Sequence, residues 1–240
     1  MNNLDDHLEA YEGDITFDFD NNIVLNWYPK RILEQQKSKE FNLLELGLGH
    51  GYSTNIFSNY YHKHVVIDGS KSIINNFQKK YPNCRAKIIE SFFETFDTDE
   101  KFDLIVMGFV LEHVDNPVTI LKHFQKFLKP NGFVYASVPN AEVMNRRLGV
   151  ISGLLSNLTE LSDNDYLLGH QRYYTKKTFS QDIQDAGYEL LQMEGIYLKP
   201  LASSQVQKLN LSDEILNALC VLGVSYPELS CGLLAKMKLK

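Results

Sequence analysis

The sequence has little cysteine, no excess of basic residues and no long apolar run. Its 240 residues contain only three widely spaced cysteines, Cys84, Cys220 and Cys231. An odd number at such distances suits reduced thiols better than a disulfide framework or a zinc site. A net charge of −6 without a long Lys/Arg cluster disfavours a surface that follows nucleic-acid phosphates. We therefore expect a small-molecule substrate and no nucleic-acid partner.

The sequence also shows no targeting or membrane-spanning segment. The first residues, "MNNLDDHLEAYEGD", are acidic and have no apolar core of a signal peptide. No later stretch is long and apolar enough to span a bilayer. With 44% apolar and 12% aromatic residues, the chain can bury a substantial core. We expect a globular cytoplasmic protein, monomeric or homodimeric, that does not associate with membranes.

Strand-like and helix-like segments alternate along the first 140 residues. Apolar, strand-like runs occupy 41–47, 64–70, 85–91, 102–110 and 132–140. Between them, residues 52–61 and 71–81 have helical spacing, and the segment 116–132 is a helix with an N-terminal Asn-Pro and a following glycine. This βαβα order predicts an α/β fold with a parallel sheet covered by helices on both faces.

A glycine-rich stretch, "LLELGLGHGYST", follows the first predicted strand. Gly47, Gly49 and Gly51 would form the turn where ligands bind in such sheets. A dinucleotide fold would use G-x-G-x-x-G, whereas here Glu45 precedes three alternating glycines. A carboxylate there would repel a pyrophosphate but could receive an ammonium group, directly or through water. Asp68, ending the second strand, is suited to a ribose, so the ligand is predicted to join an amino acid to a nucleoside.

At this point the sequence resembles the class I S-adenosylmethionine-dependent methyltransferases. The resemblance covers residues 41–140: "ELGLGHG" and "VVIDGS" look like the first two motifs of that family, and "FDLIVMGFVLEHVDNP" like its fourth-strand motif. It implies S-adenosyl-L-methionine as the cofactor. It also implies cofactor contacts, besides those of Glu45, Asp68 and the three glycines, from Gly69, Ser91, Phe92, Met107 and Gly108.

The resemblance also implies a complete architecture. It predicts a Rossmann-like seven-stranded methyltransferase sheet whose C-terminal antiparallel hairpin comes from "YELLQMEGIYLK" and "CGLLAKMKL". The chain would comprise an N-terminal cap segment (1–40) and a methyltransferase domain (41–240). A helical, substrate-covering lid insertion (141–180) follows the fifth strand, because this segment is too long for an ordinary connection.

Candidate catalytic and substrate-binding residues lie in two motifs. His113, in "LEHV", is the first candidate for a general base, with His170 in reserve, and we expect Glu112 to be solvated. In "GHQRYYT", Arg172, Tyr173 and Tyr174 would bind a phosphate or carboxylate of the acceptor; packing within a tyrosine-rich turn is the alternative. Tyr28 is a further substrate candidate. No close ligand cluster is evident, so no metal is expected.

These residues predict a methyltransferase that acts on an oxygen of a small, polar and anionic acceptor. The combination of "VLEHVDNP" and "GHQRYYT" is similar to small methyltransferases of bacterial surface-polysaccharide (capsule) pathways, which modify sugars or phosphoramidates. Two alternatives remain open. A nucleic-acid or protein methyltransferase is one, although the Asn/Asp-Pro-Pro-aromatic motif of amine-modifying enzymes is replaced by "MGFV". A noncatalytic cofactor-binding scaffold is the other.

Overall fold

The protein is described here by a computed structural model that covers residues 18–240; the first 17 residues of the predicted N-terminal cap segment lie outside the described part. Seven strands form one sheet in the order β3-β2-β1-β4-β5-β7-β6. The strands are β1 (Asn42–Leu46), β2 (Lys63–Asp68), β3 (Lys87–Glu90), β4 (Phe102–Gly108), β5 (Leu128–Pro139), β6 (Tyr188–Leu198) and β7 (Ser230–Leu239). The helices are α1 (Asp18–Gln35), α2 (Tyr52–Tyr60), α3 (Lys71–Lys80), α4 (Pro117–Phe124), α5 (Met144–Ile151), α6 (Asp163–Leu167), α7 (Lys176–Asp185), α8 (Ser203–Lys208) and α9 (Asp213–Gly223).

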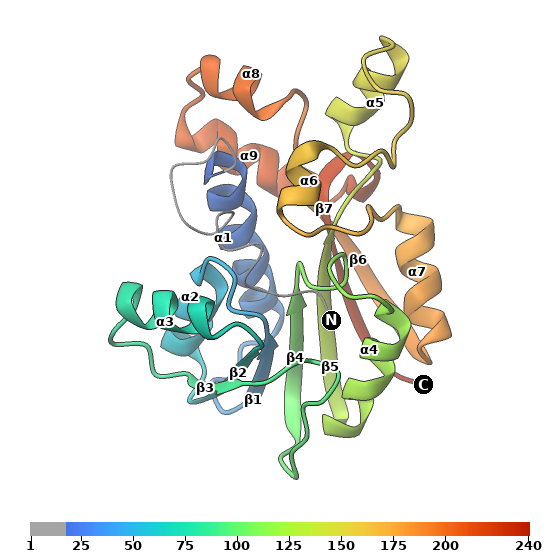
Figure 1. Ribbon diagram of the computed structural model, residues 1–240. Helices are drawn as coiled ribbons and strands as arrows, with labels where there is room; N and C mark the ends of the chain where they lie inside the picture. Colours follow the sequence, from blue (N-terminus) through green and yellow to red (C-terminus); the bar gives the residue numbers. More distant parts are fainter. Residues whose placement is uncertain (1–17) are drawn as a thin grey trace.

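The first five strands are parallel, as the βαβα order predicts. Their side chains alternate between two covered faces, so β1 reads as a continuous apolar run with one acid. Leu44 and Leu46 join the core beneath α4 and α7, whereas Leu43 joins the core beneath α1 and α2. In Figure 1, α1, α2 and α3 lie on one side of the sheet and α4 and α7 on the other. The prediction of helices on both faces is confirmed.

The antiparallel hairpin at the end of the chain is also confirmed. β6 and β7 pair with each other, and β7 inserts beside β5. The last strand therefore lies inside the sheet, with β6 at the edge. Among the residues 18–240, no helix is both long and apolar enough to cross a membrane.

The helix after β4 is shorter than the sequence predicts. Asn116 caps it by accepting a hydrogen bond from the Thr119 amide at 3.0 Å, and Pro117 occupies the first turn, as expected. However, α4 ends at Phe124 and a 3₁₀ turn follows, so that Leu128 already pairs with β4. Strand pairing ends the helix early, because Leu128 pairs with Phe102 of β4.

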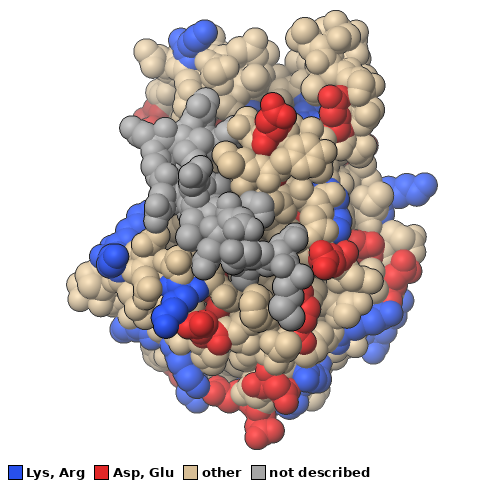
Figure 2. Space-filling model, in the orientation of Figure 1, with Lys and Arg blue, Asp and Glu red and all other residues tan. Residues whose placement is uncertain are grey.

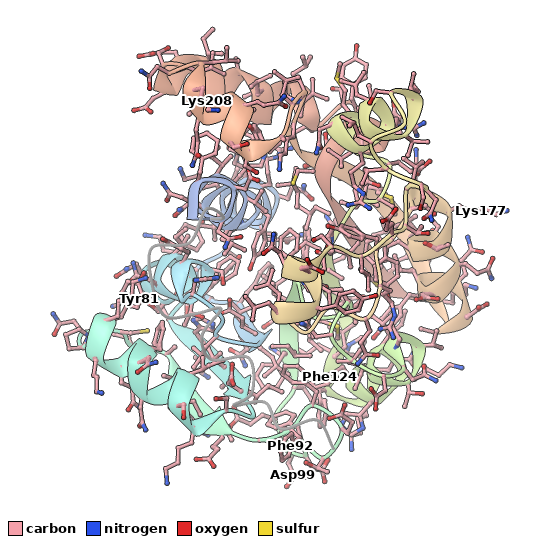
Figure 3. All side chains as sticks on the ribbon, turned by 45° about the horizontal axis from the view of Figure 1, so that its top comes forward. Tyr81, Phe92, Asp99, Phe124, Lys177 and Lys208 are labelled. Carbon is pink, nitrogen blue, oxygen red and sulfur yellow. The ribbon has the colours of Figure 1, made fainter. Side chains whose placement is uncertain are left out.

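The insertion (residues 141–180) stands over the carboxyl ends of the parallel strands. Figure 1 shows α5 and α6 above β4 and β5, and the tilted view in Figure 3 brings α6 in front of the end of β4. The chain leaves the sheet after Asn140 and returns to the same point, where Asn140 and Tyr174 form a β-bridge. The last five residues of the predicted insertion belong to α7, whose Phe179 is fully buried in the main core.

The visible surface carries charges of both signs. On the face drawn in Figure 2, lysines and arginines alternate with acidic side chains around the lower rim, while uncharged residues dominate the upper part. That face has no continuous basic surface of the kind that nucleic-acid phosphates need.

Candidate active site

The glycine loop (residues 47–51) turns the chain from β1 into α2 at the carboxyl edge of the sheet. Gly47, Gly49 and Gly51 have φ angles of 79°, 48° and 82°, a region that side-chain-bearing residues rarely adopt. At Gly51 space is restricted as well, because a Cβ atom would lie 2.6 Å from the Phe77 ring. The loop therefore needs glycine for its conformation, and it exposes bare backbone to a ligand.

Glu45 is buried beneath this loop and is fully engaged by protein groups. Its Oε1 accepts a hydrogen bond from Ser53 at 2.5 Å, and its Oε2 lies 2.8 Å from the Thr54 hydroxyl and 3.0 Å from His64 Nε2. These contacts tie the first turn of α2 to β1 and β2. In this structure Glu45 thus fixes the loop, and the three partners are residues that sequence reasoning did not single out.

Asp68 ends β2 and also supports the loop. Its two oxygens accept hydrogen bonds from the backbone amides of Leu48 and Ser70, each at 2.8 Å. Burial raises the pKa of Asp68 above its ordinary value, although these two amides act in the opposite direction. Each carboxylate oxygen can accept a second hydrogen bond, which leaves acceptor capacity for the predicted contact with a ribose. Gly69 continues the turn toward α3.

After β3, Ser91 and Phe92 are the residues expected to contact the cofactor, but it is the next residue, Phe93, that reaches the glycine loop. Phe92 is 46% exposed, and Figure 3 shows it at the rim of the molecule, near Asp99. The neighbouring Phe93 instead reaches the glycine loop, with its ring 3.9 Å from the position of a Cβ atom on Gly47. Ser91 is held to β2 by a hydrogen bond from its amide to the Asp68 carbonyl. Phe93 is therefore a loop contact that the sequence motif did not reveal.

At the end of β4 the two predicted cofactor residues have different environments. Met107 is fully buried in the core beneath α4 and α7, so its side chain does not line the site. Gly108 lies against Tyr28, whose hydroxyl would be 2.1 Å from an added Cβ atom. Tyr28 itself is buried in α1, and burial raises the pKa of its hydroxyl far above the ordinary value. Tyr28 therefore packs directly against the end of β4.

The chain then makes a sharp turn, the β4 turn (residues 109–115). Phe109 adopts a left-handed conformation with φ of 56°, a strained state for an aromatic residue. This conformation redirects the backbone, and Glu112 becomes completely buried. The expectation that Glu112 is solvated is therefore wrong. Burial raises the pKa of its carboxyl to about 7, against the opposing attraction of His170 and Arg172.

The motif "GHQRYYT" forms a docking loop (residues 169–175) that closes on the β4 turn. The Gln171 amide donates to the Glu112 carbonyl at 2.9 Å, and the Gln171 side chain donates to the His113 carbonyl at 2.7 Å. The Arg172 guanidinium donates to the carbonyls of Leu111, at 2.9 Å, and of Val114. Arg172 was predicted to bind an acceptor anion, but in this structure its donors hold the backbone of the turn.

The two tyrosines of the docking loop are also engaged. Tyr173 donates to Asp165 Oδ1 at 2.9 Å, and Tyr174 lies in the core with its hydroxyl 3.2 Å from Asp182 Oδ2. The alternative of a tyrosine-rich packing turn describes their positions better than a role in acceptor binding. Asp165 also lies 3.0 Å from His170 Nδ1.

Three chemically active side chains meet above β4. Glu112, His113 and His170 each offer a ligand atom, and these atoms all lie within 4.8 Å of one another. The rings of His113 and His170, from motifs far apart in the sequence, are edge to face with centroids 4.8 Å apart. The expectation that no close ligand cluster exists is thus wrong. We call this cluster the triad.

Comparison with known proteins agrees with this geometry. The seven-stranded sheet, the glycine loop after β1 and the acid that ends β2 form the arrangement that the sequence motifs predict for an S-adenosylmethionine-dependent methyltransferase. The family described as "Methyltransferase domain" matches residues 25–193. The chain belongs to that family, and S-adenosyl-L-methionine is its cofactor.

Among curated proteins, the chain is similar to ubiquinone biosynthesis O-methyltransferases. The mitochondrial protein of Dictyostelium discoideum is 30% identical over 114 residues, or 41% of this chain and 35% of that protein. A protein of Coxiella burnetii is 24% identical over 184 residues, covering 74% of this chain and 76% of that protein. The chain thus spans about a third of the Dictyostelium relative that it matches.

Solved structures share the fold at low sequence identity. The N-methyltransferase NodS of Bradyrhizobium japonicum, in complex with S-adenosylhomocysteine, has a TM-score of 0.63 at 15% identity, with 99% of this chain and 98% of that chain covered. The 1,6-didemethyltoxoflavin N1-methyltransferase of Burkholderia thailandensis, also with S-adenosylhomocysteine, has a TM-score of 0.64 at 14% identity, with 99% and 87% covered.

Proposed function

We propose that this protein transfers the methyl group of S-adenosylmethionine to a hydroxyl oxygen of a small polar acceptor, and that the hydroxyl loses its proton at the triad. The observation that carries the proposal is the meeting of Glu112 and His113 from the β4 turn with His170 from the docking loop, in a turn whose Val110 approaches the glycine loop. The sulfonium already activates the methyl group, so the protein must mainly align the two reactants and manage the proton.

The sheet order supports this alignment. β1 and β4 are neighbours, so the glycine loop and the β4 turn lie side by side at the carboxyl edge. Val110 of that turn approaches within 3.5 Å of the position of a Cβ atom on Gly47. A cofactor held over β1 would therefore present its methyl group toward β4, where the triad lies.

Oxygen is favoured over nitrogen as the methylated atom by the chemistry of the triad. A hydroxyl must lose its proton on methylation, and a carboxylate with two imidazoles provides groups that accept protons near neutral pH. The curated relatives carry O-methyltransferase names. The structural neighbours include N-methyltransferases, but at their low identity they support only the fold.

The proposed acceptor class is an anionic sugar derivative, phosphorylated or nucleotide-linked, or a phosphoramidate of a surface-polysaccharide pathway. Its support is the resemblance of "VLEHVDNP" and "GHQRYYT" to methyltransferases of such pathways. Because Arg172 is occupied by backbone carbonyls, we propose that a group other than this guanidinium recognises the anion.

A transfer assay with isotope-labelled methyl groups tests the proposal. Phosphorylated and nucleotide-linked sugars, neutral sugars and amines are offered as acceptors, and the methylated atom is located by carbon-13 NMR. We expect methyl ethers, with turnover strongly reduced in His113→Ala and His170→Ala. His62→Ala, which alters an exposed histidine beside Glu40, is the matched control. Transfer to amines alone would refute the assignment to oxygen.

A further inference from the structure

Glu112 is an unusual carboxylate because it is buried and unsatisfied. Its side chain is 1% exposed, and neither carboxylate oxygen has a hydrogen-bond partner among residues 18–240. Burying such a group without a partner is costly, so buried charges normally pair with other charges or coordinate metals. The only basic side chain within ion-pair range in the described structure is His113, whose Nε2 lies 4.0 Å from Glu112 Oε1.

His170 is oriented toward the same point by a well-built support. Asp165 Oδ1 lies 3.0 Å from its Nδ1 and also accepts from the Tyr173 hydroxyl. The other oxygen of Asp165 accepts from the amide and the hydroxyl of Ser162, at 2.8 and 2.5 Å. With Nδ1–H donating to a carboxylate, the tautomer of His170 leaves the lone pair on Nε2. A carboxylate behind the imidazole is the usual support of a metal-binding histidine.

We propose that Glu112, His113 and His170 form a binding site for a divalent transition-metal cation. Two imidazoles and one carboxylate are a donor set suited to zinc, iron, cobalt or manganese, with coordination positions left for other ligands. Both observations are needed: the unpartnered carboxylate supplies the negative charge, and the supported imidazole supplies a fixed nitrogen ligand. No sequence motif with metal-ligand spacing reveals the site, because His170 comes from the insertion.

The dimensions of the triad fit a metal-free site that contracts on binding. Nitrogen and oxygen ligands lie about 2.0–2.2 Å from zinc, so two ligand atoms of one ion are at most about 4.4 Å apart. The observed limit of 4.8 Å is slightly wider, and small side-chain rotations bring the atoms into range. His113 and His170 are 29% and 13% exposed, so the site is open on one side.

An open metal site at this position deepens the proposed function, on which its role rests. The acceptor hydroxyl would take one of the open positions, where the cation makes it more acidic by withdrawing electron density. Because the three side chains would then be ligands, the proton would leave to solvent water on the open side of the site. An acceptor phosphate could bind there too, which would explain how an anion is recognised although Arg172 is occupied. The cation itself undergoes no redox change.

The test is direct metal binding to the full chain after chelator treatment. Co²⁺ is titrated at about pH 7.5, where unperturbed histidines are mostly neutral, with visible absorption and calorimetry as readouts. We expect about one Co²⁺ per chain, displaced by Zn²⁺. Glu112→Gln and His170→Ala should weaken binding more than about 100-fold, and Asp165→Asn, which removes only the support, about 10- to 100-fold. His62→Ala, which alters another histidine–glutamate pair, should bind Co²⁺ normally.

Cofactor binding, measured by calorimetry for every variant, shows that each is folded. The proposal is overturned if folded wild-type protein binds neither Co²⁺ nor Zn²⁺, or if affinity is unchanged in both Glu112→Gln and His170→Ala. The two proposals fail separately. If the folded protein binds neither Co²⁺ nor Zn²⁺ but fully methylates a hydroxyl, the metal site is refuted and the proposed function stands. If metal binds at the triad but no hydroxyl is methylated, the proposed function is refuted and the metal site stands.

Discussion

At the scale of single residues, Glu112 illustrates a conflict between stability and function. A carboxylate that is buried with neither oxygen bonded destabilises the fold, and proteins retain such groups where a site requires them. The neighbouring strain at Phe109 belongs to the same turn. The buried carboxylate of Glu112 and the strained backbone of Phe109 both lower the stability of the fold, and both lie in the turn where we propose that the chemistry occurs.

We predict that Glu112→Gln stabilises the metal-free protein. The change keeps the shape of the side chain and removes a buried charge, so the free energy of unfolding should rise by roughly 1–3 kcal/mol. Urea denaturation at neutral pH, with a chelator present, measures the change. Glu189→Gln, at an exposed carboxylate that pairs with Lys238, is the control and should change stability little. A lower stability of Glu112→Gln would show that the carboxylate has a structural partner.

A second residue-level prediction concerns the glycine loop. Gly51→Ala should destabilise the protein far more than Gly49→Ala, although both require positive φ angles. At Gly49 an added Cβ meets nothing within 4 Å, so the cost is mainly the backbone conformation, about 1–2 kcal/mol. At Gly51 the Cβ also clashes with Phe77 and Tyr81. Equal losses in urea denaturation would mean that the two rings move aside freely.

Asp68 carries a prediction about the cofactor. Asp68→Ala should weaken binding of S-adenosylmethionine by roughly 1–3 kcal/mol, the range for charged hydrogen bonds left unmade. Because burial raises the pKa of Asp68, wild-type affinity should begin to fall on acidification before ordinary aspartates protonate. Calorimetry across pH measures both effects, with Asp97→Ala, at an exposed aspartate, as the control. Unchanged affinity in a folded Asp68→Ala protein would remove the ribose role.

At the scale of elements, the important contact joins the insertion to the β4 turn. The docking loop supplies no strand or helix to this contact; it binds through Gln171 and Arg172, whose donors meet the carbonyls of residues 111–115. This contact fixes the turn and brings His170 over Glu112. Arg172 therefore acts on the site by positioning the turn.

We expect Arg172→Ala to loosen this contact. Limited proteolysis should cut the docking loop faster, and methyl transfer should fall, while cofactor affinity stays the same. Arg172→Lys should restore little of the methyl transfer or of the resistance to proteolysis, because one ammonium cannot donate to several carbonyls in the geometry of a guanidinium. If Arg172→Ala instead raises only the KM for an anionic acceptor and leaves proteolysis unchanged, Arg172 binds the acceptor directly.

At the scale of the whole molecule, the sheet order makes the end of the chain indispensable. β7 pairs with β5 on one side and β6 on the other, although it follows the other six strands in sequence order. Its residues Leu233, Leu234 and Ala235 are almost completely buried. A strand at the edge of the sheet could be lost at smaller cost than this interior strand.

Truncation after Leu229 should therefore prevent folding. The shortened chain would leave the edges of both β5 and β6 unpaired and their apolar faces open to water. Circular dichroism and the loss of a cooperative thermal transition measure the effect. Removal of Lys240 alone, which lies beyond β7, should have little effect. A cooperative transition in the longer truncation would show that the first five strands fold without the hairpin.

The sequence by itself determined the parts of this protein that depend on local pattern. Alternating strands and helices and the glycines at positive φ follow from periodicity and backbone sterics, which act over a few residues, whereas the terminal hairpin was implied by the resemblance of the motifs. The resemblance of the motifs then named the cofactor. Patterns that act over a few residues did not predict the end of α4. The sequence placed that end before Gly132, whereas pairing of Leu128 with β4 ends the helix earlier, at Phe124.

Only the tertiary structure decided what the site contains. Burial of Glu112 depends on the left-handed Phe109 and on the insertion folding back over β4, which no local pattern specifies. The meeting of His113 with His170 joins two motifs whose distance in space is set by how Arg172 and Gln171 bind the β4 turn. Charge and hydrogen-bonding capacity can be read from residue types, but whether a side chain is solvated, satisfied or left without a partner depends on what packs around it.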